Sequence, residues 1–102
     1  MPAEATFRFG DLAEGKLKAV EIDGEDVVVA KVGGKCFAFG GLCTHDGGPM
    51  IDGDLDGTTI TCPWHFTEFD VRTGAVIDGL ADEALPVYEV HVDGDEVRVL
   101  KP

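Results

Sequence analysis

Cysteine and histidine occur side by side twice in this chain, as Cys43-Thr44-His45 and again as Cys62-Pro63-Trp64-His65. Thiolates and imidazoles are the side chains that most often bind zinc, copper and iron in proteins. Two of each supply enough ligands for one four-coordinate metal ion or for a small metal cluster. The two segments therefore predict a metal site.

The grouping of the ligands distinguishes two kinds of metal site. Zinc motifs commonly place cysteine near cysteine and histidine near histidine, whereas here each segment supplies one of each. Two irons bridged by sulfide fit this mixture, because each loop can give its cysteine to one iron and its histidine to the other. A structural zinc ion stays open as the alternative, and it would make the chain a zinc-stapled β module that only binds a partner.

The pattern Cys43-x-His45, followed after sixteen residues by Cys62-x2-His65, resembles the signature of Rieske [2Fe–2S] proteins. The resemblance runs roughly from Val20 to the C-terminus and includes Phe69-Asp70-Val71-Arg72-Thr73-Gly74 and Leu85-Pro86-Val87-Tyr88, as in the small soluble Rieske ferredoxins. It implies one [2Fe–2S] cluster, with Cys43 and Cys62 on the buried iron and His45 and His65 on the outer iron. These four residues are the expected cofactor-binding and metal-binding residues, and no catalytic residue is expected.

Several positions differ from the high-potential members of that family. Those members carry one more cysteine in each loop, which form a disulfide, and the matching residues here are Gly48 and Trp64. They also carry a serine and a tyrosine whose hydroxyls donate hydrogen bonds to sulfur, and here Thr67 and Phe69 take those places. Phenylalanine cannot donate, while threonine can in principle. We therefore expect a reduction potential near the low end of the Rieske range, about −150 to 0 mV.

Two further departures concern the surroundings of the predicted cluster. Phe66 stands where many Rieske proteins have glycine, and Asp78-Gly79-Leu80-Ala81 replaces a third loop that usually contains proline. We expect partner proteins to dock around the exposed histidine edges. The residues expected at this docking rim are Pro49, Met50, Trp64, Phe66 and Leu80.

The resemblance implies a one-electron carrier. Four protein ligands and two sulfides complete the coordination of both irons and leave no open position for a substrate, so we expect no enzymatic activity. The expected role is transfer of electrons from a flavin-dependent reductase to a terminal ring-hydroxylating oxygenase of an aromatic-ring dioxygenase system. The alternative role within the same family is the small subunit of an assimilatory nitrite reductase.

Short strands and tight turns must position the two loops. The dipeptide Asp-Gly, which suits hairpin turns, occurs six times. We expect strands at Lys16–Ile22, Glu25–Val32, Lys35–Phe39, Thr58–Thr61, Glu68–Val71, Ala75–Ile77, Tyr88–Val92 and Glu96–Leu100, and single turns at Asp11–Gly15 and Ala81–Leu85. The first three form a meander. The chain is expected to be one all-β domain over residues 1–102, an antiparallel sandwich or barrel with cluster-binding loops near 40–53 and 62–67.

Composition restricts the partners and the compartment. The chain has 102 residues, with 20 acidic and 8 basic side chains and a formal net charge of −12, which argues against binding to nucleic acid or to an anionic membrane. No secretory signal and no membrane-spanning apolar run is visible. The third cysteine, Cys36, is expected to be a buried inert residue, and His91 is expected to face water. We expect a cytoplasmic protein.

Overall fold

The computed structural model describes residues 4–44, 47–64, 66–79 and 83–100. Within them it contains ten β-strands and two short 3₁₀ turns, η1 (Phe9–Asp11) and η2 (Met50–Asp52). Every strand pair is antiparallel. The predicted all-β antiparallel fold is therefore confirmed. No helix in the described part of the chain is long and apolar enough to cross a membrane.

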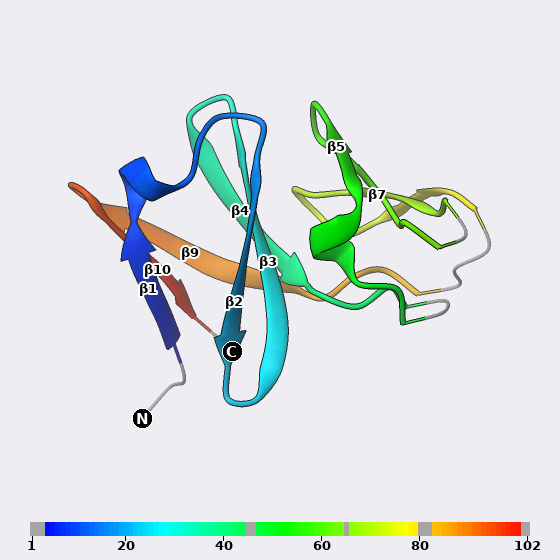
Figure 1. Cartoon of the computed structure of the whole chain (residues 1–102), viewed down its shortest axis with the longest axis horizontal. Helices are drawn as coiled ribbons and strands as arrows, with labels where there is room; N and C mark the ends of the chain where they lie inside the picture. The colour runs from blue at the N-terminus through cyan, green and yellow to red at the C-terminus, as the bar shows by residue number, and fades with distance from the viewer. Residues whose placement is uncertain (1–3, 45–46, 65, 80–82, 101–102) are drawn as a thin grey trace.

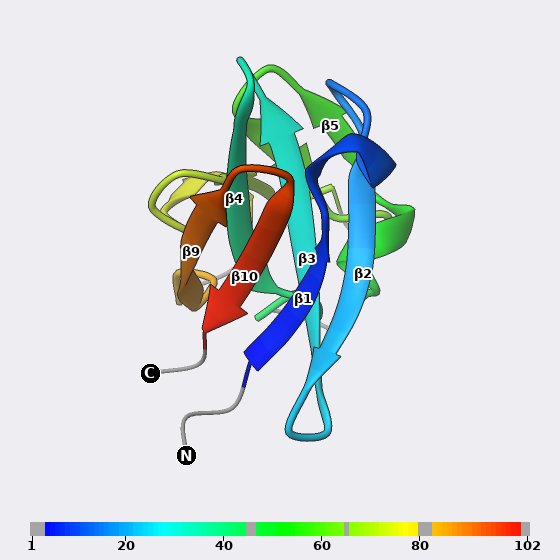
Figure 2. The same cartoon turned by 90° about the vertical axis from the view of Figure 1, so that its left-hand side faces the viewer.

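The larger sheet has six strands and curls almost into a barrel (Figure 2). In spatial order these strands are β1 (Glu4–Arg8), β10 (Glu96–Leu100), β9 (Val87–Asp93), β4 (Lys35–Gly40), β3 (Glu25–Val32) and β2 (Leu17–Ile22). The two edge strands, β1 and β2, approach each other across the opening. The sheet includes the predicted meander, because β2, β3 and β4 pair in sequence order.

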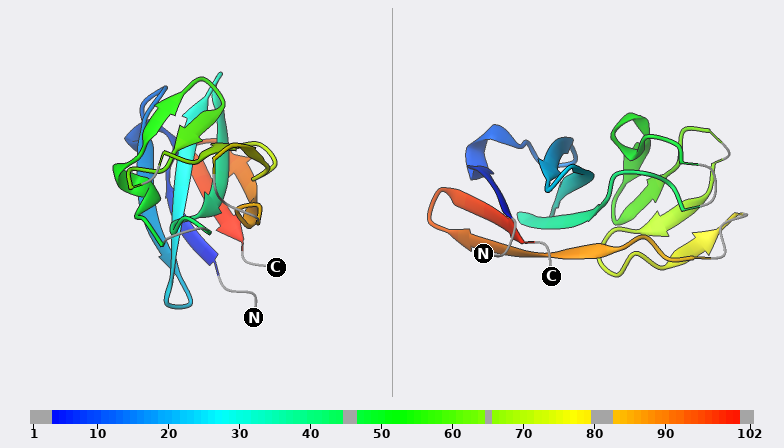
Figure 3. Two further views of the ribbon diagram at one scale, coloured as in Figure 1. Left: turned by 90° about the vertical axis from the view of Figure 1, so that its right-hand side faces the viewer. Right: turned by 90° about the horizontal axis from the view of Figure 1, so that it is seen from below.

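The smaller sheet has four strands and lies at one end of the barrel (Figures 1 and 3). Its strands follow chain order and are β5 (Asp54–Asp56), β6 (Thr59–Thr61), β7 (Glu68–Asp70) and β8 (Val76–Asp78). The first cysteine-histidine segment lies between β4 and β5, and the second lies between β6 and β7. The first segment thus lies in the connection from the larger sheet to the smaller one, and the second lies in a hairpin of the smaller sheet.

Aspartate-glycine turns connect many of these strands. Asp23-Gly24, Asp56-Gly57 and Asp93-Gly94 join consecutive antiparallel strands, and each glycine has the positive φ that such a turn requires. Asp52-Gly53 instead ends η2, where Gly53 has φ −77°, and Asp78-Gly79 leads out of β8. The dipeptide sequence alone does not show whether an Asp-Gly pair forms a hairpin turn or ends another element.

The predicted strands are present with ends shifted by at most one residue, but two strands were not predicted. Strand β1 has few β-branched residues and pairs with β10 along its full five residues, so its conformation depends on a partner distant in sequence. Strand β5 has three residues and pairs only with β6. A turn closed by the hydrogen bond from the Lys16 N–H to the Ala13 carbonyl at 3.1 Å overlaps the one expected at Asp11–Gly15, and the turn expected at Ala81–Leu85 lies partly outside the described residues.

Strand β3 separates two hydrophobic cores. Val27 and Val29 point into a core inside the barrel, while Val28 and Ala30 point into a second core between the two sheets. All four are buried, because alternate residues of a strand face opposite sides and here both sides are covered. The second core contains both cysteines of the predicted site. Strand β3 thus borders both cores, and the core between the sheets contains the two cysteines at which the loops begin.

Cys36 and His91 lie where the sequence predicts. Cys36 belongs to the core inside the barrel, and burial raises the pKa of its thiol, which favours the protonated, unreactive form. The side chain of His91 is about half exposed on β9, and its Nε2 lies 3.0 Å from Oε1 of Glu89. Both expectations are confirmed, and neither residue belongs to the candidate site.

Candidate metal centre

The loop that carries Cys43 is closed by backbone hydrogen bonds. The N–H of Cys43 donates to the carbonyl of Gly48 at 2.9 Å, and the N–H of Gly47 donates to the carbonyl of Cys43 at 2.9 Å. An isolated antiparallel bridge joins Leu42 to Pro49 just outside these bonds. These bonds of Cys43 with Gly47 and Gly48 therefore close the base of the loop at the end of a hairpin-like stem.

The loop that carries Cys62 has the same closure. The N–H of Cys62 donates to the carbonyl of Thr67 at 2.8 Å, and the N–H of Phe66 donates to the carbonyl of Cys62 at 3.1 Å. Its stem is the β6–β7 hairpin, in which Thr61 pairs with Glu68. In both loops cysteine stands first, and its N–H and C=O groups bond to the sixth and fifth residues.

The fifth position of each loop adopts the left-handed backbone conformation. Gly47 has φ 75° and Phe66 has φ 62°. Glycine reaches this region freely, whereas residues with a Cβ pay a conformational cost there. Only Phe66 and Asp23 among the described non-glycine residues have positive φ. The loop geometry thus gives a physical reason why glycine suits this position, and Phe66 occupies it under strain.

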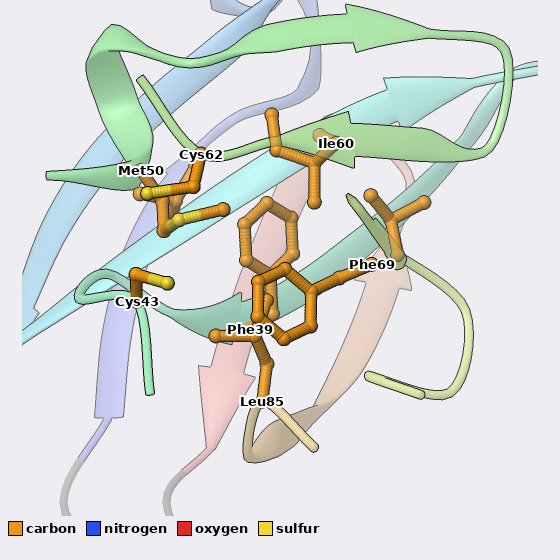
Figure 4. Packing of buried hydrophobic residues seen from close by; sticks show 10 residues of the cluster. Phe39, Cys43, Met50, Ile60, Cys62, Phe69 and Leu85 are labelled. Atoms are coloured by element: carbon orange, nitrogen blue, oxygen red, sulfur yellow. The ribbon is translucent and has the colours of Figure 1, made fainter. Parts of the chain in front are cut away.

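Both cysteine side chains lie in the core between the sheets. Cys62 is fully buried, Cys43 is 4% exposed, and Met50 is fully buried in the same cluster (Figure 4). Figure 4 shows the three sulfur-containing side chains together on one side of the cluster, next to Phe39 and Phe69. The expectation that Met50 belongs to an exposed docking rim is wrong, because η2 turns its side chain inward.

The segment between β8 and β9 contacts both cysteine loops. From the first loop, the Thr44 hydroxyl donates to the carbonyl of Glu83 at 2.6 Å. On the other side, Gly79 packs against Thr67 so closely that a Cβ at Gly79 would lie 2.8 Å from the Thr67 Oγ1. This segment therefore connects the two loops without a covalent bond. No disulfide forms among the three cysteines, all of which the structure describes.

The Phe69–Gly74 stretch, which carries part of the family resemblance, forms a structural turn. The Arg72 guanidinium lies 2.9 Å from the Asp70 carboxylate and holds the pKa of that carboxyl below its usual value. The N–H of Gly74 donates to the carbonyl of Asp70 at 2.7 Å. A Cβ at Gly74 would collide with the carbonyl oxygen of Leu85, so this glycine allows the turn to pack against the segment that precedes β9.

The donor set fits an iron–sulfur cluster in two respects. Two buried cysteines on similarly closed loops provide soft sulfur ligands at the edge of an apolar core. In addition, the Thr67 Oγ1 is buried and has no hydrogen-bond partner among the described residues. Buried polar atoms without a partner are rare in native proteins, and an ion or group bound beside them is one explanation. The surroundings of Cys62 thus match a bound group with acceptor atoms.

The other predicted site residues are exposed, partly buried or outside the described residues. Trp64 is 55% exposed and Phe66 is 71% exposed, as expected for a rim, while Pro49 is partly buried. His45, His65 and Leu80 lie outside the described residues. The two histidine ligands therefore stay predictions. Sequence reasoning did not find the Thr44–Glu83 hydrogen bond, which joins residues 39 positions apart and has no local sequence signal.

Comparison with known proteins gives concordant matches. The family model described as "Rieske [2Fe-2S] domain" matches residues 5–89. The ferredoxin component of the naphthalene 1,2-dioxygenase system of Pseudomonas aeruginosa is 33% identical over 89 residues, which cover 87% of this chain and 86% of that protein.

Solved structures give similar matches. The ferredoxin of carbazole 1,9a-dioxygenase from Nocardioides aromaticivorans IC177 superposes with a TM-score of 0.90 at 31% identity, covering 100% of this chain and 98% of that one. A chain in a complex of reduced oxygenase and oxidized ferredoxin of carbazole 1,9a-dioxygenase gives a TM-score of 0.86 at 32% identity, covering 90% and 95%. Family model, sequence relatives and structural neighbours thus agree with one another.

Proposed function

Because the chain belongs to the Rieske [2Fe–2S] domain family and carries that family's cluster, we propose that it is the ferredoxin component of an aromatic-ring dioxygenase system. In this role it passes single electrons from a flavin-dependent reductase to a terminal ring-hydroxylating oxygenase. The observation that carries the proposal is the likeness, over almost the whole length of both chains, to ferredoxin components of such systems. A solved complex of such a ferredoxin with its oxygenase supports the second half of the route.

We assign four ligands to the cluster. Cys43 and Cys62 bind one iron through sulfur, and His45 and His65 bind the other through imidazole nitrogen. The cluster supplies reversible one-electron chemistry when it is bound. The assignment of the cysteines is supported by their burial and by the matching backbone closure of their loops. The assignment of the histidines rests on their spacing in the sequence.

The protein's own residues hold and insulate the site. Both cysteines lie against a wall of apolar side chains, which keeps water from the sulfur ligands on that side. Phe69 belongs to that wall and has no hydroxyl to donate to sulfur, and the net charge of −12 disfavours uptake of a further electron. These features support a reduction potential near the low end of the Rieske range.

Trp64 and Phe66 form the exposed apolar border of the second loop. They flank His65 in the sequence, and both are more than half exposed. Large aromatic side chains contribute strongly to protein contacts because they bury much apolar area with few rotatable bonds. We propose that partners dock here through a small transient interface, below ~1,200 Å² in total. The cysteine content supports a reducing compartment, and we assign the carrier to the cytoplasm.

The first experiment counts the cofactor. Protein purified without air should contain two irons and two inorganic sulfides per chain and show a reversible one-electron signal in paramagnetic resonance. Cys43→Ser and Cys62→Ser should lose both iron and sulfide, because serine is a poor ligand for iron–sulfur clusters. Cys36→Ser is the matched control and should keep the cluster. A colourless protein with one zinc would refute the cluster assignment.

The second experiment tests the route. Chemically reduced protein is mixed with an oxidised Rieske oxygenase and, in a separate reaction, with the sirohaem subunit of an assimilatory nitrite reductase. Reoxidation of the chain with matching reduction of the oxygenase is the expected result. Stable association with the nitrite reductase, with no electron transfer to any tested oxygenase, would overturn the proposed role while leaving the cluster in place.

A further inference from the structure

Phe66 combines a strained backbone with an exposed aromatic ring. Its φ of 62° lies in the left-handed region, where a residue with a Cβ pays a conformational cost. Asp23 is the other non-glycine residue with positive φ in the described part of the chain, and aspartate visits this region because its short polar side chain bonds locally. Phenylalanine has no such compensation. The local turn therefore does not account for the residue type at position 66.

The ring of Phe66 does not stabilise the fold either. It is 71% exposed, the largest fraction among the large hydrophobic side chains that the structure describes, and it belongs to neither hydrophobic core. The main chain closes the loop, since the Phe66 N–H donates to the carbonyl of Cys62 at 3.1 Å. At the same position of the first loop, Gly47 makes the equivalent bond to Cys43. Glycine at position 66 would thus close the loop equally well.

Strain and exposure together point to a role outside the chain. Residues held in unfavourable backbone regions cluster at functional sites, where the strain is part of how the site works. A residue that lowers stability is retained where function needs it. Phe66 directly follows the predicted ligand His65, and the half-exposed Trp64 precedes it. The ring therefore belongs to the loop at which we expect electrons to leave the carrier.

We propose that Phe66 is a specificity-determining residue, whose ring fits an apolar recess on the terminal oxygenase. This inference rests on the proposed function. An aromatic side chain that enters a recess is the kind of residue that dominates binding at a small interface. The same ring holds off an oxygenase whose surface is shaped for glycine at this position, and such a steric obstacle discriminates between partners. Selection matters because a reduced carrier that docks on a wrong acceptor loses its electron there.

The test measures electron transfer from the reduced, cluster-loaded protein to three purified terminal oxygenases, those of the naphthalene 1,2-dioxygenase, p-cumate 2,3-dioxygenase and carbazole 1,9a-dioxygenase systems. With the oxygenase for which the wild type has the lowest KM, Phe66→Gly and Phe66→Ala should both raise KM about tenfold at nearly constant kcat. With the oxygenase for which the wild type has the highest KM, both should lower KM about threefold, because the obstacle is gone.

Two further variants separate the ring from the backbone and from general surface effects. Phe66→Tyr keeps the ring and the strain, so its KM values should stay within about twofold of the wild type. Val92→Ala removes part of a half-exposed apolar side chain from β9 in the larger sheet and is the matched control, with no expected change. Iron, sulfide and the reduction midpoint are measured for each variant, so that a damaged cluster is not read as altered docking.

Three results would overturn the inference at full cluster content. These are KM values of Phe66→Gly and Phe66→Ala within twofold of the wild type for every oxygenase, a rise by the same factor for all three, and a clear difference between Gly and Ala, which would assign the effect to the backbone. A wild type that keeps its cluster but reduces none of the oxygenases would instead refute the proposed role, and the inference with it.

Discussion

The left-handed conformation at the fifth position of both cysteine loops leads to a quantitative prediction at Phe66. Phe66→Gly and Phe66→Ala both remove the exposed ring, so the difference between them reports on the backbone. At φ 62° a residue with a Cβ costs about 1–2 kcal/mol relative to glycine. Glycine loses about 0.4–1 kcal/mol through the greater entropy of its unfolded chain. Phe66→Gly should therefore be more stable than Phe66→Ala by about 0.5–1 kcal/mol.

The first loop provides the matching measurement. Gly47 has φ 75°, and a Cβ built there would meet no atom within 4 Å, so Gly47→Ala should change only two terms, the cost of a Cβ at positive φ and the opposing gain from a less flexible unfolded chain. We expect it to destabilise the protein by about 0.5–1 kcal/mol, the same glycine preference as at position 66. Gly10 is the control, since it lacks a positive φ and also has open space around a Cβ. Gly10→Ala should stabilise the protein by about 0.4–1 kcal/mol.

The assay is denaturant unfolding of the cluster-loaded proteins under argon, followed by far-ultraviolet circular dichroism. Stability differences are taken from midpoints at constant slope, because a changed slope would signal a change in the unfolded state or loss of two-state behaviour. For a domain of this size, 1 kcal/mol corresponds to a thermal shift of roughly 4 °C. The reasoning is refuted if Phe66→Ala is at least as stable as Phe66→Gly, or if Gly47→Ala gains stability as Gly10→Ala does.

Three further predictions concern individual side chains. Thr44→Val removes the hydroxyl that donates to Glu83 at 2.6 Å, and the loss of about 1 kcal/mol of hydrogen bonding should shorten the lifetime of the cluster in air roughly fivefold. Thr6→Val, on the exposed face of β1, is the control and should leave this lifetime unchanged. An equal effect of both variants would show that the Thr44–Glu83 contact does not protect the cluster. Glu14 accepts N–H groups from the β3–β4 turn at 2.7 and 2.9 Å, which lowers the pKa of its carboxyl, so it stabilises the fold above its unfolded-state pKa and stops doing so as the pH falls through the lower folded-state value. Glu14→Gln should therefore lower the thermal midpoint at pH 7 and not in acid, and an equal loss at both pH values would contradict the charge-based account. Phe69→Tyr adds a donor next to the cysteines and should raise the reduction equilibrium up to about tenfold, ~59 mV, in a redox titration; an unchanged midpoint would show that the missing hydroxyl does not set the potential.

Local sequence predicts the parts of this fold that depend on neighbouring residues. The meander from Leu17 to Gly40 is predictable because its strands are β-branched and its two turns carry Asp23-Gly24 and Gly33-Gly34. Strand β1 is not predictable in this way, since its partner β10 lies at the other end of the chain. The double burial of β3 is visible as a run of apolar residues, but the two separate cores on its faces appear only in three dimensions.

The same distinction applies to the candidate site. Residue type and spacing suffice to identify Cys43 and Cys62, because ligand chemistry restricts which side chains bind metal. The inward orientation of Met50 was missed because a 3₁₀ turn inside an irregular loop has no hydrophobic periodicity to reveal it. The contact of Thr44 with Glu83 depends on how a third segment folds back across the loops. Neither feature has a local pattern.

The shared closure of the two loops also bears on how such a carrier changes over evolutionary time. Main-chain groups make the hydrogen bonds that close each loop, so an exposed side chain such as Trp64 contributes little to holding the ligands in place. Substitutions there can retarget the protein to a new redox partner without rebuilding the ligand geometry. A change of redox partner within this fold therefore requires substitutions at only a few exposed positions of the loops.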